Sequence, residues 1–317
     1  MNPFQTLIVT AVGALALAMA THIRATESQS PSALTLTKVT ETVYSAIGEA
    51  GPPTYENGGH NNNLSVVLTE AGVVVFNGGD SYRLASRLHL SIKQLTDLPV
   101  LWVVNENGQG HSFLGNSYWR EQGVKLIAHK EAVAEMREQG PQILERMRAL
   151  NRDKAAGTWV AIPDFHFEET WSVQLGKTLV ELRSFGPAHS PGDISLWLPQ
   201  RKVLISGDIA FHQRLLAIFP ETNVASWIES FDRMAALAPE FIIPGHGEPT
   251  DMQTIRWTTQ GYLQYLTAQI EEILESDGGL TEAYAIDQSA YAHLNTFEEL
   301  AVKNAGRLFQ TMEMEAF

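Results

Sequence analysis

The segment Ser184-Phe-Gly-Pro-Ala-His-Ser-Pro-Gly-Asp-Ile-Ser-Leu-Trp-Leu-Pro-Gln-Arg-Lys-Val-Leu-Ile-Ser-Gly-Asp208 decides the fold. Its two apolar runs, Ile194–Leu198 and Val203–Ser206, predict short strands that are joined by a turn. His189 lies in the loop before the first strand, and Asp208 follows the second. Imidazole and carboxylate groups are good ligands for a metal such as zinc. The segment therefore predicts part of a metal site, and the other ligands must come from elsewhere in the chain.

The composition is that of a folded, acidic protein. Of the 317 residues, 44% are hydrophobic and 18% are charged, as in globular proteins generally. The net charge of -14 argues against nucleic acid or an anionic membrane as a partner, so a small-molecule substrate is expected. Because the chain has no cysteine, any metal must be held by histidines and carboxylates.

The N-terminal segment predicts export. An apolar run from Leu7 ends in Ala18-Met19-Ala20, which matches the small-residue pattern of a signal-peptide cleavage site. We expect a signal peptide over residues 1–20, a flexible lead-in over 21–38 and one domain over 39–317. The expected location is periplasmic or secreted. Residues 1–6 contain no lysine or arginine, so an uncleaved N-terminal anchor is the alternative, and no other membrane segment is expected.

The rest of the chain alternates between predicted strands and helices. Gly72–Phe76 and Val100–Val104 are unbroken apolar runs, as in strands that are buried on both faces, and the residues between them have helical spacing. Histidines recur where such elements end, at His60, His111, His189, His212 and His246. The remaining elements are predicted strands at 39–46, 64–69, 125–128, 165–167, 178–184 and 241–243, and predicted helices at 113–122, 131–152 with an interruption at Gly140-Pro141, 227–237, about 252–275, 281–284 and 297–314.

Three motifs in the second half resemble those of the metallo-β-lactamase superfamily. Gly186-Pro-Ala-His-Ser-Pro-Gly-Asp193 is similar to the loop that supplies a metal-binding histidine. Ser206-Gly-Asp208 is similar to the motif of the bridging aspartate, and Pro244-Gly-His-Gly247 to that of the last histidine. The tail from Asn304 resembles the closing helix of periplasmic members tied to quinoprotein or sulfur-oxidation systems. The resemblance implies a mixed α/β fold, a four-layer αββα sandwich, whose C-terminal helices occupy about 252–317.

The first motif of the family, His-x-His-x-Asp-His, is degenerate here. Alignment on Gly115-Asn116 puts Asn107 and Gln109 at the first two histidine positions, His111 at the aspartate and Ser112 at the last histidine. Amide side chains are poor zinc ligands. The residue that closes the strand Gly72–Phe76 is an asparagine, Asn77, where the family has an aspartate. We therefore expect Asn77, Asn107, Gln109 and Ser112 to line the pocket rather than to bind metal.

The remaining ligands allow one metal ion. His111, Asp208 and His246 provide two imidazoles and a carboxylate, which is the minimum for a catalytic metal with open positions, and His189 lies nearby as a fourth ligand. The expected cofactor is one divalent metal, zinc or else iron or manganese, with Asp208 as the catalytic residue. His60 and His212 are weaker candidates because loop histidines are commonly exposed.

Two functions remain open at this point. The first is an atypical hydrolase that uses a single metal to activate water against an ester-, thioester- or lactone-like substrate. The second is a non-catalytic binding or accessory protein that has lost its metal. The two lost histidines favour the second function, whereas the new His111 favours the first.

Overall fold

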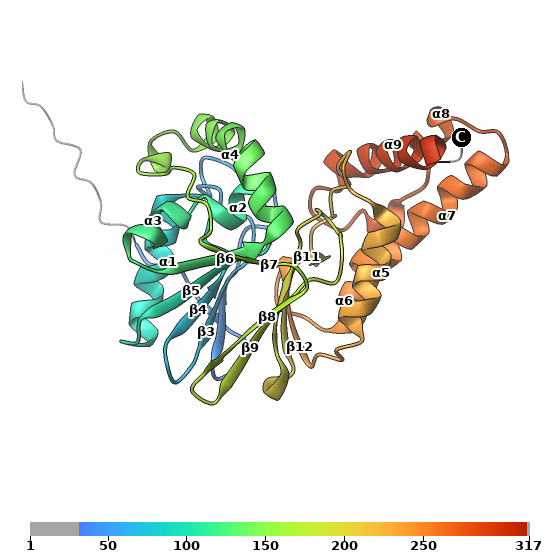
Figure 1. Ribbon diagram of the computed structural model, residues 1–317. Coiled ribbons are helices and arrows are strands. Elements are labelled where there is room, and N and C mark those ends of the chain that lie inside the picture. The colour runs from blue at the N-terminus through green and yellow to red at the C-terminus, as the bar shows by residue number, and fades with distance from the viewer. Residues whose placement is uncertain (1–31, 316–317) are drawn as a thin grey trace, which may run out of the picture. The chain divides into compact units, whose positions relative to one another are not determined.

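The computed structural model describes residues 32–315, which form two β-sheets with helices outside them (Figure 1). The predicted signal peptide lies outside the described residues, as does the lead-in up to residue 31. The later part of that lead-in is described, and it contains the first strand, β1 (Thr37–Lys38). No helix within residues 32–315 is long and apolar enough to cross a membrane.

The first sheet has seven strands in sequential order. Its first four strands pair antiparallel, and its fourth to seventh strands pair parallel. The strands are β1, β2 (Val43–Ala46), β3 (Leu64–Leu68), β4 (Val73–Phe76), β5 (Val100–Asn105), β6 (Lys125–His129) and β7 (Phe165–Phe167).

The second sheet has five strands in the order β12-β11-β10-β9-β8. The pairs are antiparallel except between β11 and β12, which run parallel. Parallel pairing brings the carboxyl ends of β11 and β12 to the same edge of the sheet. The strands are β8 (Thr170–Leu175), β9 (Thr178–Arg183), β10 (Ser195–Leu198), β11 (Val203–Phe211) and β12 (Phe241–His246).

The two sheets pack face to face over an apolar core. In β4, Val74 and Phe76 belong to this core, whereas Val73 and Val75 face the helices on the outer side. In β11, Val203 and Ile205 likewise face the first sheet, and Leu204 faces the outer helices. Strands buried on both faces need apolar residues at every position, which explains their unbroken runs.

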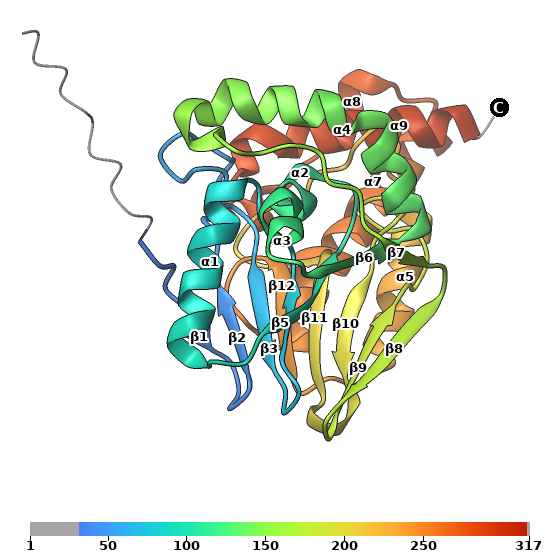
Figure 2. The same cartoon turned by 60° about the vertical axis from the view of Figure 1, so that its left-hand side comes forward.

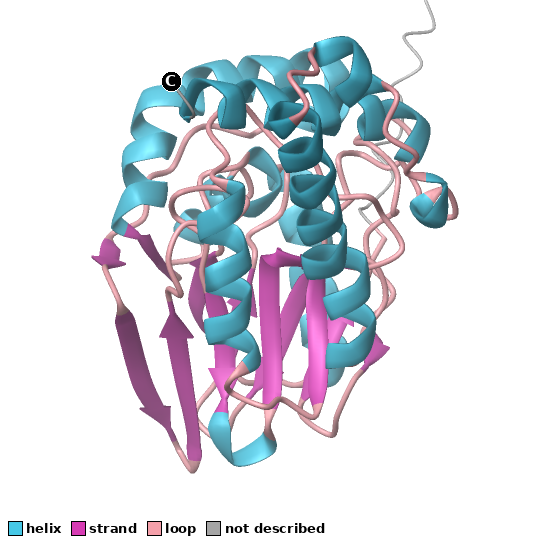
Figure 3. Ribbon diagram, turned by 90° about the vertical axis from the view of Figure 1, so that its right-hand side faces the viewer, coloured by secondary structure: helices cyan, strands magenta, loops and turns pink. Residues whose placement is uncertain are grey.

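Helices cover both outer faces, so the layers are α, β, β and α (Figures 1 and 3). This mixed α/β sandwich confirms the predicted fold class. The helices on the first sheet are α1 (Tyr82–Leu95), α2 (Gly110–Phe113), α3 (Asn116–Glu121) and α4 (Lys130–Asn151). Those on the second are α5 (Val224–Ala235), α6 (Met252–Ile255), α7 (Tyr262–Glu275), α8 (Leu280–Tyr284) and α9 (Phe297–Glu315).

The structure corrects three sequence-based predictions. Helix α4 contains Pro141 and is continuous, so the predicted interruption was wrong; the helix changes direction along its length instead (Figure 2). The predicted helix over about 252–275 contains a π-helical turn at Arg256–Gly261. The edge strand β8 was not predicted, although Thr170–Leu175 alternates between polar and apolar residues as a half-buried strand does.

Candidate metal centre

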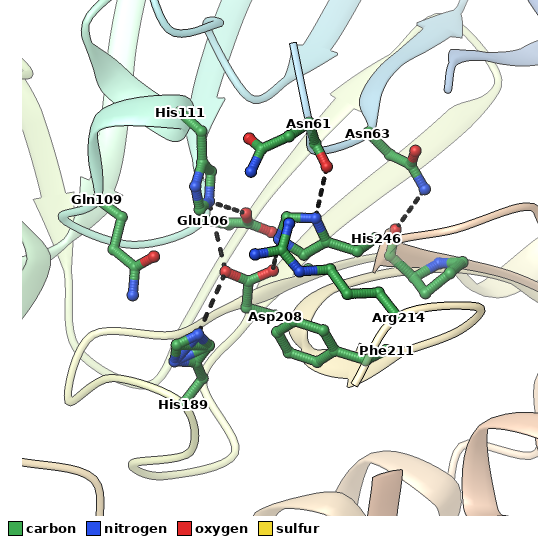
Figure 4. Close-up of polar contacts among 12 residues, drawn as sticks. Asn61, Asn63, Glu106, Gln109, His111, His189, Asp208, Phe211, Arg214 and His246 are labelled. Carbon is green, nitrogen blue, oxygen red and sulfur yellow. Dashed lines mark hydrogen bonds and ion pairs between the residues drawn. The ribbon is translucent and has the colours of Figure 1, made fainter. Parts of the chain in front are cut away.

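Four of the predicted ligands meet at one edge of the two sheets. Asp208 lies on β11 and His246 ends β12, and these strands are paired in parallel. His189 comes from the loop between β9 and β10, and His111 from the short helix α2 that follows β5. The cluster therefore joins the C-terminal half of the chain to the loop 105–112, which carries the degenerate first motif (Figure 4).

The distances single out three of these residues. Nε2 of His111 lies 3.4 Å from Oδ2 of Asp208, and Nε2 of His246 lies 3.4 Å from Oδ1. One potential ligand atom from each of the three residues lies within 4.8 Å of the others. Nε2 of His189 is 4.0 Å from Oδ2 of Asp208, so this residue stands slightly outside the group. These ligand roles stay predictions.

The orientation of His246 leaves a lone pair directed at Asp208. Nδ1 of His246 donates to the carbonyl oxygen of Asn61 at 2.5 Å, since a carbonyl can only accept. Burial lowers the pKa of His246 to about 3, so the ring is neutral and its Nε2 is an acceptor. Oδ1 of Asp208 receives no hydrogen bond from any residue between 32 and 315. Nε2 of His246 and Oδ1 of Asp208 are therefore two acceptors that face each other with no proton between them. Such a pair is suited to binding one metal cation together.

The cluster holds an excess of buried carboxyl groups. Glu106, Asp193 and Asp208 are all almost completely buried. Asp193 accepts from the backbone and hydroxyl of Ser190 and from Nδ2 of Asn107. Burial raises the pKa of Asp193 well above its ordinary value. Because an unpaired buried charge is costly, such a set favours a positive partner.

His111 provides positive charge when no metal is present. Its Nε2 lies 3.1 Å from Oε1 of Glu106 and also faces Asp208. Burial alone would lower the pKa of His111, but these two carboxylates raise it to about 10. The pKa of Glu106 rises to about 7 through burial and through the neighbouring Asp208. Burial opposes the ionisation of Asp208, yet the imidazoles of His246 and His111 hold its pKa below the ordinary value.

Of the four residues expected to line the pocket, only Gln109 faces the cavity. The other three, Asn77, Asn107 and Ser112, are buried behind the cavity wall. Their hydrogen bonds hold the loop 105–112 in place. Oδ1 of Asn77 accepts from the hydroxyl of Ser112 at 3.1 Å and from the backbone N–H of Glu106 at 3.3 Å. Nδ2 of Asn107 donates to Asp193 at 3.1 Å and to Asp208 at 3.4 Å.

The two weaker histidine candidates lie apart from the cluster. His60 is half-buried, and its Nε2 lies 3.3 Å from the carbonyl oxygen of Ala46. Burial lowers the pKa of His60 to about 4. The backbone N–H of His212 donates to the carbonyl of His246, so this residue supports the strand end through its main chain.

A cavity of about 590 Å³ opens onto the cluster. On the sides formed by α4 and by the loop after β11, its walls combine apolar and charged side chains in about equal number. The apolar lining includes Ile143, Met147, Leu150, Phe211, Ala217 and Phe219, and the charged lining includes Glu135, Arg146, Arg214 and Glu221. The site can therefore admit a small molecule that has both apolar and polar parts.

The loop after β11 is held from behind by helix α9. Oδ1 of Asn304 accepts from the backbone N–H of Ile218 at 2.9 Å, and its Nδ2 donates to the carbonyl of Leu216 at 2.8 Å. Nη1 of Arg307 donates to the carbonyl of Ile218 at 2.6 Å. The terminal helix thereby fixes a wall of the cavity.

Sequence reasoning missed several of these residues. Arg214 lines the cavity and donates to the carbonyl of Gly51, but it belongs to no motif. Nδ2 of Asn63 donates to the carbonyls of Pro244 and Gly247 and so positions the turn around His246. Glu106 had one available signal, since an acidic residue directly after a buried strand often serves a site.

Comparison with known proteins identifies the family of this chain. The sequence profile of the Metallo-beta-lactamase superfamily matches residues 57–246. The chain is 22% identical to the Metallo-beta-lactamase type 2 of Bacteroides fragilis over 176 residues, which is 54% of this chain and 67% of that protein. The metallo-beta-lactamase from Pontibacter korlensis superposes with a TM-score of 0.58 at 18% identity, covering 73% of this chain and 99% of that one. The DIM-1 metallo-beta-lactamase exposed to ceftazidime gives a TM-score of 0.59 at 16% identity, with 74% and 99% covered. The chain thus belongs to the metallo-β-lactamase superfamily.

Proposed function

We propose that the protein is an atypical hydrolase that uses one divalent metal ion, held by His111, Asp208 and His246. Membership of a metallohydrolase superfamily supports the class of reaction. The observation that carries the proposal is the opposed pair of acceptors, Nε2 of His246 and Oδ1 of Asp208, 3.4 Å apart. Glu106, whose pKa of about 7 lets it ionise near neutral pH, adds negative potential that attracts a cation.

The protein groups around the centre have distinct roles in this proposal. Asn61 fixes the tautomer of His246 through its carbonyl, so that Nε2 is available as a ligand. Asn107 holds one oxygen of Asp208 and so orients the carboxylate. When bound, a divalent metal supplies Lewis-acid chemistry and activates water for attack on a carbonyl carbon.

The substrate class we propose is a small ester, thioester or lactone. The cavity supports this class because the apolar residues of its walls suit the body of such a molecule, while the candidate metal ligands lie at one side of it. Zinc is the proposed metal, with iron or manganese as alternatives that suit a mixed nitrogen and oxygen donor set.

A second candidate function is binding without catalysis. Nε2 of His111 lies close to both Glu106 and Asp208, and Nδ2 of Asn107 donates to the same oxygen of Asp208. A protonated His111 thereby balances part of the buried negative charge without any metal. This arrangement favours an accessory protein that keeps the cavity and has lost the ion.

Metal content separates the two functions. Protein purified without chelators should contain about one zinc, iron or manganese per chain, and Asp208→Ala should lose it. Glu135→Ala is a suitable control, because it removes a carboxylate from the cavity wall but not from the cluster. Hydrolysis of a set of activated esters, thioesters and lactones should follow the metal content. Protein without metal would favour the binding function, and two ions per chain would contradict the single-metal centre.

We also propose that the protein is exported and acts in the periplasm or outside the cell. The support is the apolar run that ends in Ala18-Met19-Ala20. N-terminal sequencing of the protein from a periplasmic fraction should find a start just after residue 20. An intact Met1 on a membrane-bound protein would support the anchor instead.

A further inference from the structure

Glu106 is a fully buried carboxylate with a single hydrogen-bonding side chain beside it. Its Oε1 contacts Nε2 of His111 at 3.1 Å, and its Oε2 receives no hydrogen bond from the described chain. Within residues 32–315, no lysine or arginine pairs with it. In Figure 4 this carboxylate lies beside His111 at the edge of the Asp208 cluster.

Metal binding at the cluster would remove that one side-chain partner. The atom of His111 that faces Glu106 is the same Nε2 that faces Asp208. Once the lone pair of Nε2 is directed to a metal, this nitrogen no longer donates to Glu106. Both oxygens of Glu106 would then lie unsatisfied in the interior, which is costly for a carboxylate.

The backbone of β11 makes room for this carboxylate. Gly207 has a positive φ of 60°, and a β-carbon at this position would lie 2.3 Å from Oε2 of Glu106. A side chain here would therefore displace Glu106 from the cluster. Glycine at position 207 therefore allows Glu106 to lie close to β11, the strand that carries Asp208.

We propose that Glu106 is a fourth metal ligand. It compensates for the imidazole ligands that the first motif of the family supplies and that this chain lacks, because Asn107 and Gln109 stand at those positions. The inference rests on the single-metal centre proposed above. The donor set would then consist of His111, His246, Asp208 and Glu106, with the Glu106 side chain turned towards the ion, because in this structure only the other three residues have ligand atoms within 4.8 Å of one another. Its two carboxylates balance the charge of a divalent ion inside the protein, and its oxygen content makes manganese and iron suitable alongside zinc.

The test compares metal affinity in Glu106→Gln and in the control Glu135→Gln. The substitution at 106 keeps the size of the side chain but removes its charge. Competition with a chelator gives the Kd for zinc, and cobalt absorption spectra report the donor set; neither needs a turnover assay. We expect Glu106→Gln to weaken binding by more than about a hundredfold, beyond the loss typical of groups that only orient a ligand. Its cobalt spectrum should also change, whereas Glu135→Gln should match the wild type in both measurements.

A crystal structure of the wild-type protein soaked with zinc tests the proposal even if Glu106→Gln fails to fold. An oxygen of Glu106 should lie about 2.0–2.2 Å from the ion. The proposal is overturned if Glu106 stays off the ion, if the variant binds zinc as tightly as the control, or if the wild type binds no metal. Tight metal binding through Glu106 without hydrolysis of any ester would uphold this inference and count against the proposed function.

Discussion

Metal binding should release a proton from His111 and should therefore tighten as the pH rises. In the metal-free protein Asp208 and Glu106 outweigh the effect of burial and raise the pKa of His111 from 6.5 to about 10. At pH 7 its Nε2 is protonated, and this proton must leave before the nitrogen can bind a metal. The cost is about 1.4 kcal/mol for each of roughly three pH units, or about 4 kcal/mol.

The Kd at pH 7 should therefore be about a thousandfold weaker than its limit at high pH, and it should fall about tenfold per pH unit between pH 7 and 9. Chelator competition across this range measures the slope. Calorimetry in two buffers of different ionisation enthalpy should count about one proton released by His111 per metal ion at pH 7, and roughly half a proton more if Glu106, with a pKa of about 7, also binds the ion. A Kd that does not vary with pH, or binding without proton release, would refute the electrostatic account of the cluster.

The same proton links folding to pH in the metal-free protein. Because the folded-state pKa of His111 lies above its unfolded value, the stabilisation is complete below pH 6.5 and is lost as the pH rises through about 10. Metal should remove this dependence, since it takes the place of the proton. Urea denaturation with and without zinc at pH 7 and 9 would show the difference.

Three substitutions test other parts of the structure. Burial raises the pKa of Asp80 from 3.8 to about 7, so the free energy of unfolding should fall as the pH rises through this range. Asp80→Asn can keep the hydrogen bond from Asn151 but carries no charge. In urea denaturation it should therefore stabilise the fold by up to about 4 kcal/mol at pH 8 and have little effect below pH 4. Gly207→Ala should lower the thermal midpoint and weaken zinc binding, because its β-carbon would collide with Glu106; an unchanged midpoint would contradict the close approach. Asn63→Ala should destabilise the protein by about 3 kcal/mol in chemical denaturation, because two buried carbonyls near His246 lose their donor; a loss below about 0.5 kcal/mol would mean that water replaces the amide.

Sequence patterns predicted the layers of the fold because those layers follow from local apolar runs and from short motifs. The run at 73–76 is apolar at every position because it faces the second sheet on one side and helices on the other. The edge strand β8 has no such run; its signal was the alternation of Thr170–Leu175 between polar and apolar residues, which was not recognised. A proline inside α4 predicts an interruption, but the helix continues through it and changes direction along its length (Figure 2).

The candidate metal centre was only partly predictable, because its motifs identify candidate ligands but not the residues that these ligands contact. Asp208 and His246 stand in recognisable motifs, and the structure places them with His111. The contact of Glu106 with His111 depends on how the loop after β5 folds against β11. The role of Asn304 depends on contacts across more than eighty positions of sequence. Such pairings arise from tertiary packing, which a single sequence does not display.

The link between α9 and the loop after β11 makes the shape of the cavity depend on a helix that lies outside it. Asn304 and Arg307 hold the backbone at Leu216 and Ile218, next to the cavity-lining residues Ala217 and Phe219. Loss of Asn304 or Arg307 would therefore free the backbone of this wall without removing a candidate ligand. Two relatives with identical metal centres could accept different molecules because their last helices differ, and selection for a new substrate could act on residues that never touch it.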